Sequence, residues 1–288
     1  MPIAPTAQLV TEAASRSRAV AAFNVITLEH AEAIAEAAER TGQPAILQIS
    51  QNAVRFHGRL GPVAAASRAV ADSSTAALAL HLDHVEDEAL LHQAADHGFS
   101  SAMFDAGALP YADNLAATRA AARWAHDAGL WLEAELGYVG GKPDAPVSAH
   151  AAGVRTDPDE AREFVAETGV DALAVAVGSS HAMTSRSASL DTELIARLRE
   201  AVPVPLVLHG SSGVPDEQLR AATAAGIVKV NIGTALNIAF TGAVRSTLAD
   251  QDAAAPRQPP SPDCRKYLAS ARAAMADIVA ELLQVVSG

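Results

Sequence analysis

Three histidines each follow a short apolar run of the sequence: His84, His181 and His209. Neutral imidazole is a common ligand of Zn²⁺, and a catalytic zinc site combines three protein ligands with one open position. A single histidine after a strand more often makes a structural hydrogen bond, so the metal interpretation depends on all three lying together. The other seven histidines fall within strands, helices or loops, where roles at the surface or behind the ligands are expected.

Several carboxylates follow the same kind of run. Asp83 directly precedes His84, and an extended chain would point the two side chains to opposite sides. Asp83 is therefore either an acid that orients an imidazole or a general acid–base group beside a metal. Asp105 follows the next run, and Glu133 and Glu135 share one face of a later one. Either glutamate can contact a metal or its ligands, although a structural ion pair explains Glu133 equally well.

Small, donor-rich loops mark the second half of the chain. They are 178–180 (GSS), 210–213 (GSSG) and 231–234 (NIGT). Backbone N–H groups in such loops, together with a helix N-terminus, bind phosphate in many α/β barrels. Tight turning is the simpler interpretation of any one of these glycines. Three such loops in succession favour a phosphate site.

The elements that must position these residues are eight β-branched or aliphatic runs separated by Ala-rich stretches of helical character. Strands that alternate with helices pair in parallel, and eight such repeats predict a closed (β/α)8 barrel. A doubly wound open sheet is the alternative, but it requires a glycine-rich first turn where this chain has Phe23-Asn24-Val25. The predicted strands are 19–25, 45–49, 77–82, 100–104, 131–136, 172–177, 205–209 and 228–232.

Helix boundaries are readable in places. Asp157-Pro158 predicts a helix start and Gly169 its end, because an Asp N-cap followed by proline favours initiation. In the same way, helices are expected from Pro215 to Gly226 and over 29–40. The segment 250–263 reads as a loop that leads to a final helix over 264–286. We therefore expect one domain, 1–288, of the α/β class, with a C-terminal helical extension.

Composition excludes several classes of protein. The 288 residues contain 33 acidic and 21 basic side chains, which disfavours binding to nucleic acid or an anionic membrane surface. A small anionic substrate in a local pocket remains compatible with this charge. One cysteine, Cys264, excludes an internal disulfide and a cysteine-based metal cage. With no signal peptide or membrane span in the pattern, a cytoplasmic protein is expected.

The motifs together resemble the class II, zinc-dependent ketose-bisphosphate aldolases, which include fructose-1,6-bisphosphate and tagatose-1,6-bisphosphate aldolases. The resemblance runs in order from about residue 5 to the C-terminus. It is carried by AFNV (22–25), LHLDHVED (80–87), SAMFDAGALPYADN (101–114), LEAELGYVGG (132–141), AVAVGSSH (174–181), LVLHGSSGVPDE (206–217), VKVNIGTALNIAF (228–240) and DCRKYL (263–268).

The resemblance implies roles for individual residues. It implies one catalytic Zn²⁺, with a second divalent or monovalent cation as an option, a small phosphorylated sugar as substrate, and a homodimer or homotetramer. The implied zinc ligands are His84, His181 and His209, and Asp105 and Glu135 are implied for a more buried metal position. By the same resemblance Asp83 exchanges a proton with the C4 hydroxyl, and the phosphate of dihydroxyacetone phosphate is bound by Gly210, Ser212, Asn231 and Thr234. Asn24 and Ser50 would line the cleft, and Arg265 would reach a neighbouring subunit's site to hold the far phosphate.

The chain departs from the family pattern in two loops. Ala182 stands where glycine usually follows the second histidine, and Arg186 is the nearest replacement for a usual lysine. In the loop after Gly141, Pro143 stands near the position of the usual proton-transferring glutamate, and Asp144 is the nearest substitute. Either Asp144 transfers that proton, or another group does so, or the substrate differs from the common sugars.

Fructose 1,6-bisphosphate is the first expected substrate, cleaved to dihydroxyacetone phosphate and glyceraldehyde 3-phosphate. Tagatose 1,6-bisphosphate and other ketose or sugar-acid phosphates are alternatives. A Schiff-base aldolase would need a lysine near the barrel rim, and Lys229 has no clear role there. A metal-assisted hydrolase would leave the phosphate loops unexplained. A non-catalytic aldolase-like subunit is a more distant alternative, since the three histidines and Asp83 are all present.

Overall fold

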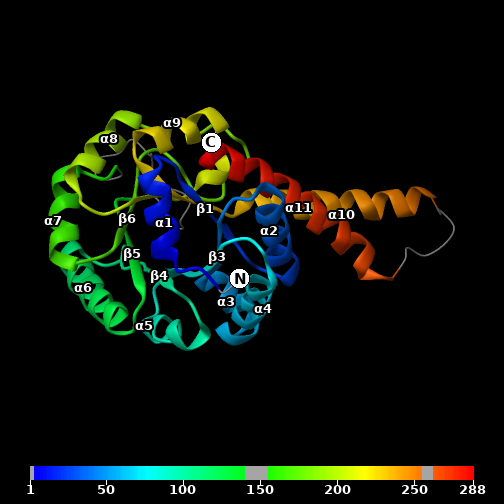
Figure 1. Cartoon of the computed structure of the whole chain (residues 1–288), viewed down its shortest axis with the longest axis horizontal. Coiled ribbons are helices and arrows are strands. Elements are labelled where there is room, and N and C mark those ends of the chain that lie inside the picture. The colour runs from blue at the N-terminus through cyan, green and yellow to red at the C-terminus, as the bar shows by residue number, and fades with distance from the viewer. Residues whose placement is uncertain (1–2, 140–154, 255–261) are drawn as a thin grey trace.

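A computed structural model describes residues 3–139, 155–254 and 262–288, in which eight parallel strands close into one barrel in chain order (Figure 1). All eight predicted strands are present, so the (β/α)8 prediction is confirmed. The strands are β1 Val20–Asn24, β2 Ala45–Ser50, β3 Leu78–Val85, β4 Ser101–Phe104, β5 Trp131–Leu136, β6 Ala172–Val175, β7 Leu206–Leu208 and β8 Ile227–Ile232.

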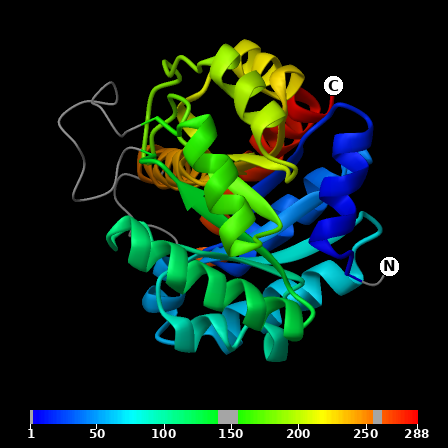
Figure 2. The same cartoon turned by 90° about the vertical axis from the view of Figure 1, so that its left-hand side faces the viewer.

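Helices surround the barrel on its outer face (Figure 2). Their buried sides consist largely of alanine and branched aliphatic residues that pack on the outward-facing strand side chains in a single core. The helices of the described residues are α1 Thr6–Ser15, α2 Leu28–Thr41, α3 Gln51–His57, α4 Leu60–Ser73, α5 Glu88–Leu91, α6 Tyr111–Asp127, α7 Pro158–Thr168, α8 Thr192–Ala201, α9 Asp216–Ala225, α10 Thr234–Ala254 and α11 Cys264–Ser287, with short 3₁₀ turns η1 Ala95–His97 and η2 Ser211–Gly213.

Predicted helix ends agree with the structure except at one place. The Asp157 side chain accepts hydrogen bonds from the amides of Asp159 and Glu160, and Gly169 ends α7 in the left-handed conformation. The prediction of a loop over 250–263 is wrong for 250–254, which form the last turn of α10. Alanines in this stretch favour the helix, and its polar residues are compatible with an exposed helix surface.

The barrel interior changes from apolar to polar along the strands. At the amino ends, Val20, Ile46 and Ala79 form an apolar cluster with Leu9 and Val10 of α1, which packs across this end of the barrel. Higher in the barrel the inward-facing, fully buried residues include Gln48, His81, Glu133 and Lys229. The carboxyl end is therefore the polar end, where barrel enzymes have their active sites.

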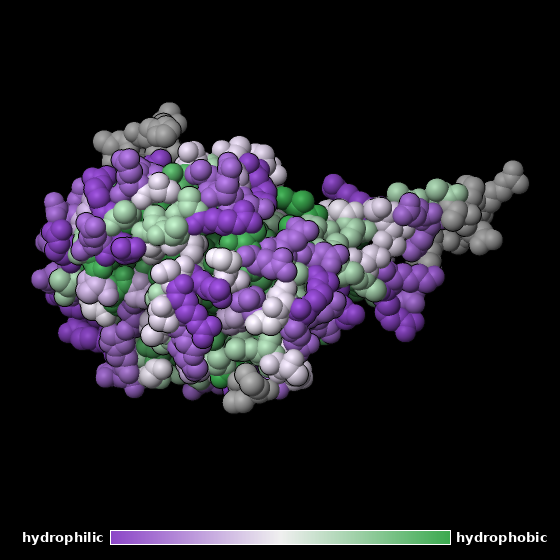
Figure 3. Space-filling view, turned by 45° about the horizontal axis from the view of Figure 1, so that its top comes forward, coloured by the Kyte–Doolittle hydropathy of each residue, from purple (hydrophilic) through white to green (hydrophobic). Residues whose placement is uncertain are grey.

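The helices α10 and α11 form an arm that projects beyond the barrel (Figure 1). The arm is attached to α2 by ion pairs of Arg40 with Asp277 and of Arg272 with Glu32, at 2.9 and 3.0 Å. Hydrophilic residues are spread over the barrel surface, and paler, more apolar residues lie between them along the arm (Figure 3). Among the described residues, no helix has the length and apolar character that a membrane span would need.

Candidate active site

A bulge at the end of β3 turns two neighbouring side chains toward the barrel mouth. Leu82 and Val85 pair with residues of β4 that are only two positions apart, so Asp83 and His84 together oppose Met103. His84 has a φ of 47°, in the left-handed region. The expectation that Asp83 and His84 point to opposite sides is therefore wrong, because a bulge breaks the alternation of an extended strand.

Three imidazoles meet above the bulge. The ring centroid of His84 lies 5.1 Å from that of His181 and 4.8 Å from that of His209. One ligand atom from each of these histidines and one from Glu135 all lie within 4.8 Å of one another. The barrel thus brings side chains from β3, β5 and the loops after β6 and β7 to one point.

His209 is held between two glutamates of β5. Its Nε2 lies 2.8 Å from Oε1 of Glu133, and its Nδ1 lies 2.9 Å from Oε2 of Glu135. Burial lowers the pKa of His209, but the two carboxylates outweigh it and raise the pKa to about 9. The two carboxylates thus favour the protonated ring, and a ring nitrogen must give up its proton before it can bind a metal.

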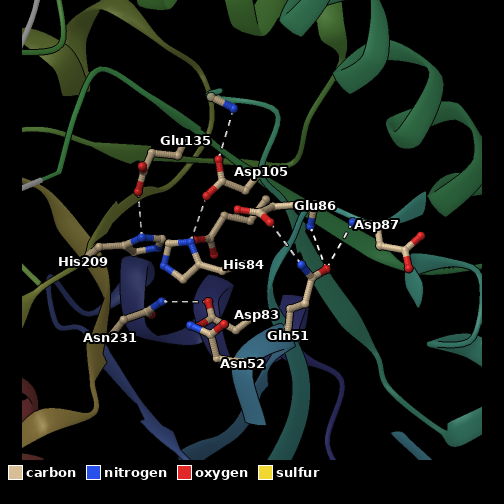
Figure 4. Close-up of polar contacts among 12 residues, drawn as sticks. Gln51, Asn52, Asp83, His84, Glu86, Asp87, Asp105, Glu135, His209 and Asn231 are labelled. Carbon is tan, nitrogen blue, oxygen red and sulfur yellow. Dashed lines mark hydrogen bonds and ion pairs between the residues drawn. The ribbon is translucent and has the colours of Figure 1, made fainter. Parts of the chain in front are cut away.

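His84 is oriented by Asp105. Nδ1 of His84 lies 3.1 Å from Oδ2 of Asp105, whose other oxygen accepts the amide of Gly107 at 3.1 Å (Figure 4). Burial opposes protonation of His84, but Asp83 and Asp105 raise its pKa. Because Nδ1 is occupied, Nε2 is the atom that His84 can offer to a metal. Asp105 itself is not among the four residues whose ligand atoms converge.

Asp83 lies at the centre of this polar region and is only 2% exposed. The Nδ2 group of Asn231 donates to its Oδ1 at 3.4 Å, and Nε2 of His81 lies 3.9 Å from the same oxygen. Burial would raise the pKa of Asp83, but the imidazoles of His84 and His209 and further positive groups lower it. Asp83 is therefore a carboxylate that can accept a proton.

A buried ammonium lies below these groups. Lys229 of β8 is fully buried and donates to Glu133 and Asn231, each at 2.8 Å. Such a doubly bonded, enclosed ammonium is a poor candidate to attack a carbonyl, which argues against the Schiff-base alternative. The sequence signal for Lys229 was its place on the inward face of a strand, in register with Val207 and Val20.

Gln51 was not identified from the sequence, and it fixes the loop after β3. Its Oε1 accepts the amides of Glu86 and Asp87 at 3.0 and 3.1 Å, and its Nε2 donates to the Glu86 carboxylate at 3.1 Å (Figure 4). Gln51 is buried at the start of α3, directly after β2. Only that position in the chain could have drawn attention to it.

The donor-rich loops contact one another at the barrel mouth. A Cβ at Gly210, whose φ is 65°, would lie 2.6 Å from the carbonyl carbon of Ser180, so only glycine permits this approach. Ser212 accepts the amide of Ala235 at 3.1 Å, which joins the loop after β7 to the first turn of α10, where Thr234 lies. The loops after β6, β7 and β8 thus meet at a helix N-terminus.

The other predicted site residues are more scattered. Asn24 ends β1, accepts a hydrogen bond from Gln48 at 2.9 Å and lies against Gly233. Ser50 caps α3 by accepting the amide of Ala53 at 3.2 Å. Arg265 is exposed, pairs with Asp263, and lies in the first turn of α11 at the outer end of the arm (Figure 1). Asp144 lies outside the described residues.

Ala182 and Arg186, which differ from the family pattern, both lie in the loop after β6, and the structure shows what each does there. Ala182 has a φ of 57°, a conformation that glycine adopts more easily. The Arg186 guanidinium contacts the carbonyl of Val214 and the carboxylate of Asp216, which ties this loop to the start of α9. Arg186 thus already has a structural role.

Known proteins share both the sequence pattern and the barrel of this chain. The family described as fructose-bisphosphate aldolase class-II matches residues 4–288. Among solved structures, the YdjI aldolase from Escherichia coli K12 is 30% identical, with a TM-score of 0.81 over 99% of this chain and 97% of that one. The fructose-bisphosphate aldolase (Fba) from Campylobacter jejuni is 21% identical, with a TM-score of 0.81 over 99% and 95%. This second likeness concerns the fold alone.

Proposed function

The chain belongs to the class II fructose-bisphosphate aldolase family, and from this premise we propose that it is a zinc-dependent lyase that reversibly cleaves a ketose phosphate. Its products would be dihydroxyacetone phosphate and an aldehyde. Fructose 1,6-bisphosphate is the first candidate substrate, and glyceraldehyde 3-phosphate is the corresponding aldehyde. Tagatose 1,6-bisphosphate and sugar-acid phosphates are the alternatives.

The donor set fits zinc. His84, His181, His209 and Glu135 offer nitrogen and oxygen atoms within 4.8 Å of one another. Asp105 and Glu133 each occupy one nitrogen of a histidine, which is the usual arrangement behind a zinc-binding imidazole. Three imidazoles would hold the ion and leave a position for substrate, with Glu135 close enough to serve as a further ligand.

The reaction requires stabilisation of the negative charge that develops when the C3–C4 bond breaks. A zinc ion held by the three histidines would act as a Lewis acid and stabilise this charge. Asp83 accepts the proton of the C4 hydroxyl. Its lowered pKa keeps the carboxylate ionised and therefore able to take this proton. Asn231 holds one oxygen of Asp83 and so restricts the orientation of the carboxylate.

Phosphate recognition would come from the loops after β6, β7 and β8. Gly210, Ser212 and Thr234 lie where backbone amides gather at the N-terminus of α10. An anion is favoured there because the first amides of a helix have no partner within it. Such binding fixes the reacting carbons over the metal ligands, and orientation contributes much of the rate acceleration of an enzyme.

Two parts of the proposal concern residues away from this cluster. Asp144 remains the predicted donor of the proton that completes dihydroxyacetone phosphate. Arg265 lies at the outer end of the arm, so its proposed contact with a far phosphate requires a neighbouring subunit, as in a homodimer or homotetramer. The acidic composition is compatible with the proposed cytoplasmic location.

The convergence of three histidines and Glu135 beside Asp83 is the observation that carries this proposal. The test is a coupled assay for release of dihydroxyacetone phosphate from fructose and tagatose bisphosphates and their monophosphates, with zinc measured in the same samples. Release that a chelator abolishes and zinc restores is expected. A protein that binds zinc and cleaves none of the panel would refute these substrates, and a protein that binds no metal would refute the site.

A further inference from the structure

The ammonium of Lys229 contacts two groups that act on different parts of the candidate site. Its Nζ donates to Oε2 of Glu133 and to Oδ1 of Asn231, both at 2.8 Å. The other oxygen of Glu133 lies 2.8 Å from Nε2 of His209. The amide nitrogen of Asn231 donates to Asp83 at 3.4 Å (Figure 4). One buried cation therefore connects a metal-binding histidine with the carboxylate that accepts the proton.

The contact with Asn231 determines which way its amide faces. A lysine ammonium has only donors, so Asn231 must turn its carbonyl oxygen toward Lys229. The amide nitrogen then faces Asp83 and can donate to the carboxylate. Without Lys229 only the contact with Asp83, at 3.4 Å, would remain to orient the amide, so its orientation would be less restricted.

The contact with Glu133 determines which nitrogen His209 offers. Lys229 holds Oε2 of Glu133, so Oε1 is directed at His209 and can accept the proton on its Nε2. The lone pair of Nδ1 is then the one that a metal can use, on the side of Glu135. Both effects originate in a group that touches neither the metal-binding atoms nor the barrel mouth.

We infer that Lys229 is a positioning residue that sets the orientation of His209 through Glu133 and of Asp83 through Asn231. The inference rests on the proposed function. A competing explanation is that Lys229 only neutralises Glu133 in the core. The two explanations differ in what they expect once a variant is folded, because a neutralising role affects stability, whereas a positioning role affects zinc affinity and kcat.

The experiment replaces Lys229 by Met in the full-length protein. Three quantities are measured: zinc affinity of the metal-free protein by competition with a chromophoric chelator, kcat and KM at saturating zinc, and the unfolding midpoint. We expect zinc affinity to fall by about 10-fold or more and kcat to fall by about 10-fold or more, with little change in KM. If this variant does not fold, Lys229→Gln retains a polar donor and is measured instead.

A double-mutant cycle with Asn231→Ala tests the route to Asp83. If Lys229 acts on Asp83 through Asn231, its substitution lowers kcat much less when Asn231 is already alanine. Equal losses of kcat in both backgrounds would overturn the inference. Unchanged zinc affinity and kcat in a folded Lys229 variant would also overturn it.

Ile46→Ala is the matched control for destabilisation. Ile46 is fully buried in the apolar layer near the amino ends of the strands and belongs to none of these polar contacts. At a temperature where both variants are folded, it should keep parental zinc affinity and kcat; equal losses in the control would overturn the inference. Failure of the proposed function is distinguishable, because the parent would then cleave no substrate, while zinc affinity would still test the link from Lys229 to His209.

Discussion

Asp105 holds Nδ1 of His84 at 3.1 Å through one oxygen and the amide of Gly107 at 3.1 Å through the other. The carboxylate is thus anchored to the backbone while it orients the ring. His84 itself lies on a bulge with a left-handed φ of 47°, so both its backbone and its side chain are constrained. This arrangement explains how an imidazole on an irregular strand end can have one defined orientation.

The contact with Asp105 predicts a loss of metal affinity on substitution. Asp105→Ala removes the acceptor at Nδ1 and should weaken zinc binding by about 10- to 100-fold. Equilibrium dialysis against a zinc buffer measures the change. Asp171→Ala is the control, because Asp171 directly precedes β6, at the amino ends of the strands, where it contacts His126 at 3.0 Å and the amide of Leu132 at 2.7 Å. Equal zinc affinities in the two variants would contradict this role of Asp105.

Substitution of Asp83 should separate chemistry from metal binding. Asp83→Asn keeps the size of the side chain and an oxygen that Asn231 can donate to, but it removes the proton acceptor. We expect kcat to fall by about 100- to 10,000-fold, the usual range for loss of a general base. Zinc content by atomic absorption should stay at the parental level. Substantial remaining turnover would show that another group takes the proton.

Gly210 should be intolerant of a side chain for steric reasons. In Gly210→Ala the new methyl would meet the Ser180 carbonyl at 2.6 Å, so the loops after β6 and β7 must separate. We expect kcat/KM for a phosphorylated ketose to fall by about 100-fold, since small misplacements of a binding site have effects of this size.

Gly129→Ala is the matched control for that substitution. Gly129 has a φ of 74°, similar to the 65° of Gly210, but a Cβ there meets nothing within 4 Å. The control should therefore lose about 1 kcal/mol of stability from backbone strain and keep its activity. Equal losses of activity in the two variants would mean that strain, and not the contact with Ser180, limits the site.

Acid should destabilise the joint between α2 and the arm. His30 is buried, its ring lies 5.6 Å from that of Phe240 of α10, and burial lowers its pKa against the opposing effects of Asn237 and Glu29. In the unfolded chain His30 has its ordinary pKa, so below about pH 6.5 the unfolded state binds more protons than the folded state. The contribution of neutral His30 to stability is therefore fully present above that pH and is lost as the pH falls below it.

The measurement is the free energy of unfolding by urea between about pH 8 and pH 5. His30→Gln removes the titrating group and should show a shallower decline than the parent. Other histidines also contribute: the lowered pKa of His81, about 3, acts with the same sign, whereas the raised pKa values of His84 and His209 act with the opposite sign. The difference between parent and variant is therefore the quantity that reports on His30. Parallel curves for the parent and the variant would contradict the assignment to His30.

The sequence by itself determined the barrel and much of its mouth. The eight strand runs and signals such as Asp157-Pro158 and Gly169 are local, so they can be recognised without knowing what packs against them. The three histidines were also predictable as a group, since parallel strands end at one edge. The prediction of a loop over 250–263 was wrong at 250–254, because the polar residues there are as compatible with an exposed helix as with a loop.

Only the tertiary structure decided how the site is held. The bulge that turns Asp83 and His84 the same way depends on pairing with β4, which the sequence of β3 does not reveal. The contact of Lys229 with Glu133 joins positions 96 residues apart and exists only because the barrel closes. Gln51 likewise binds amides that lie 35 and 36 residues further along the chain. Local patterns specify where strands and helices occur, whereas hydrogen bonds between distant buried groups depend on register and closure, which the whole fold determines.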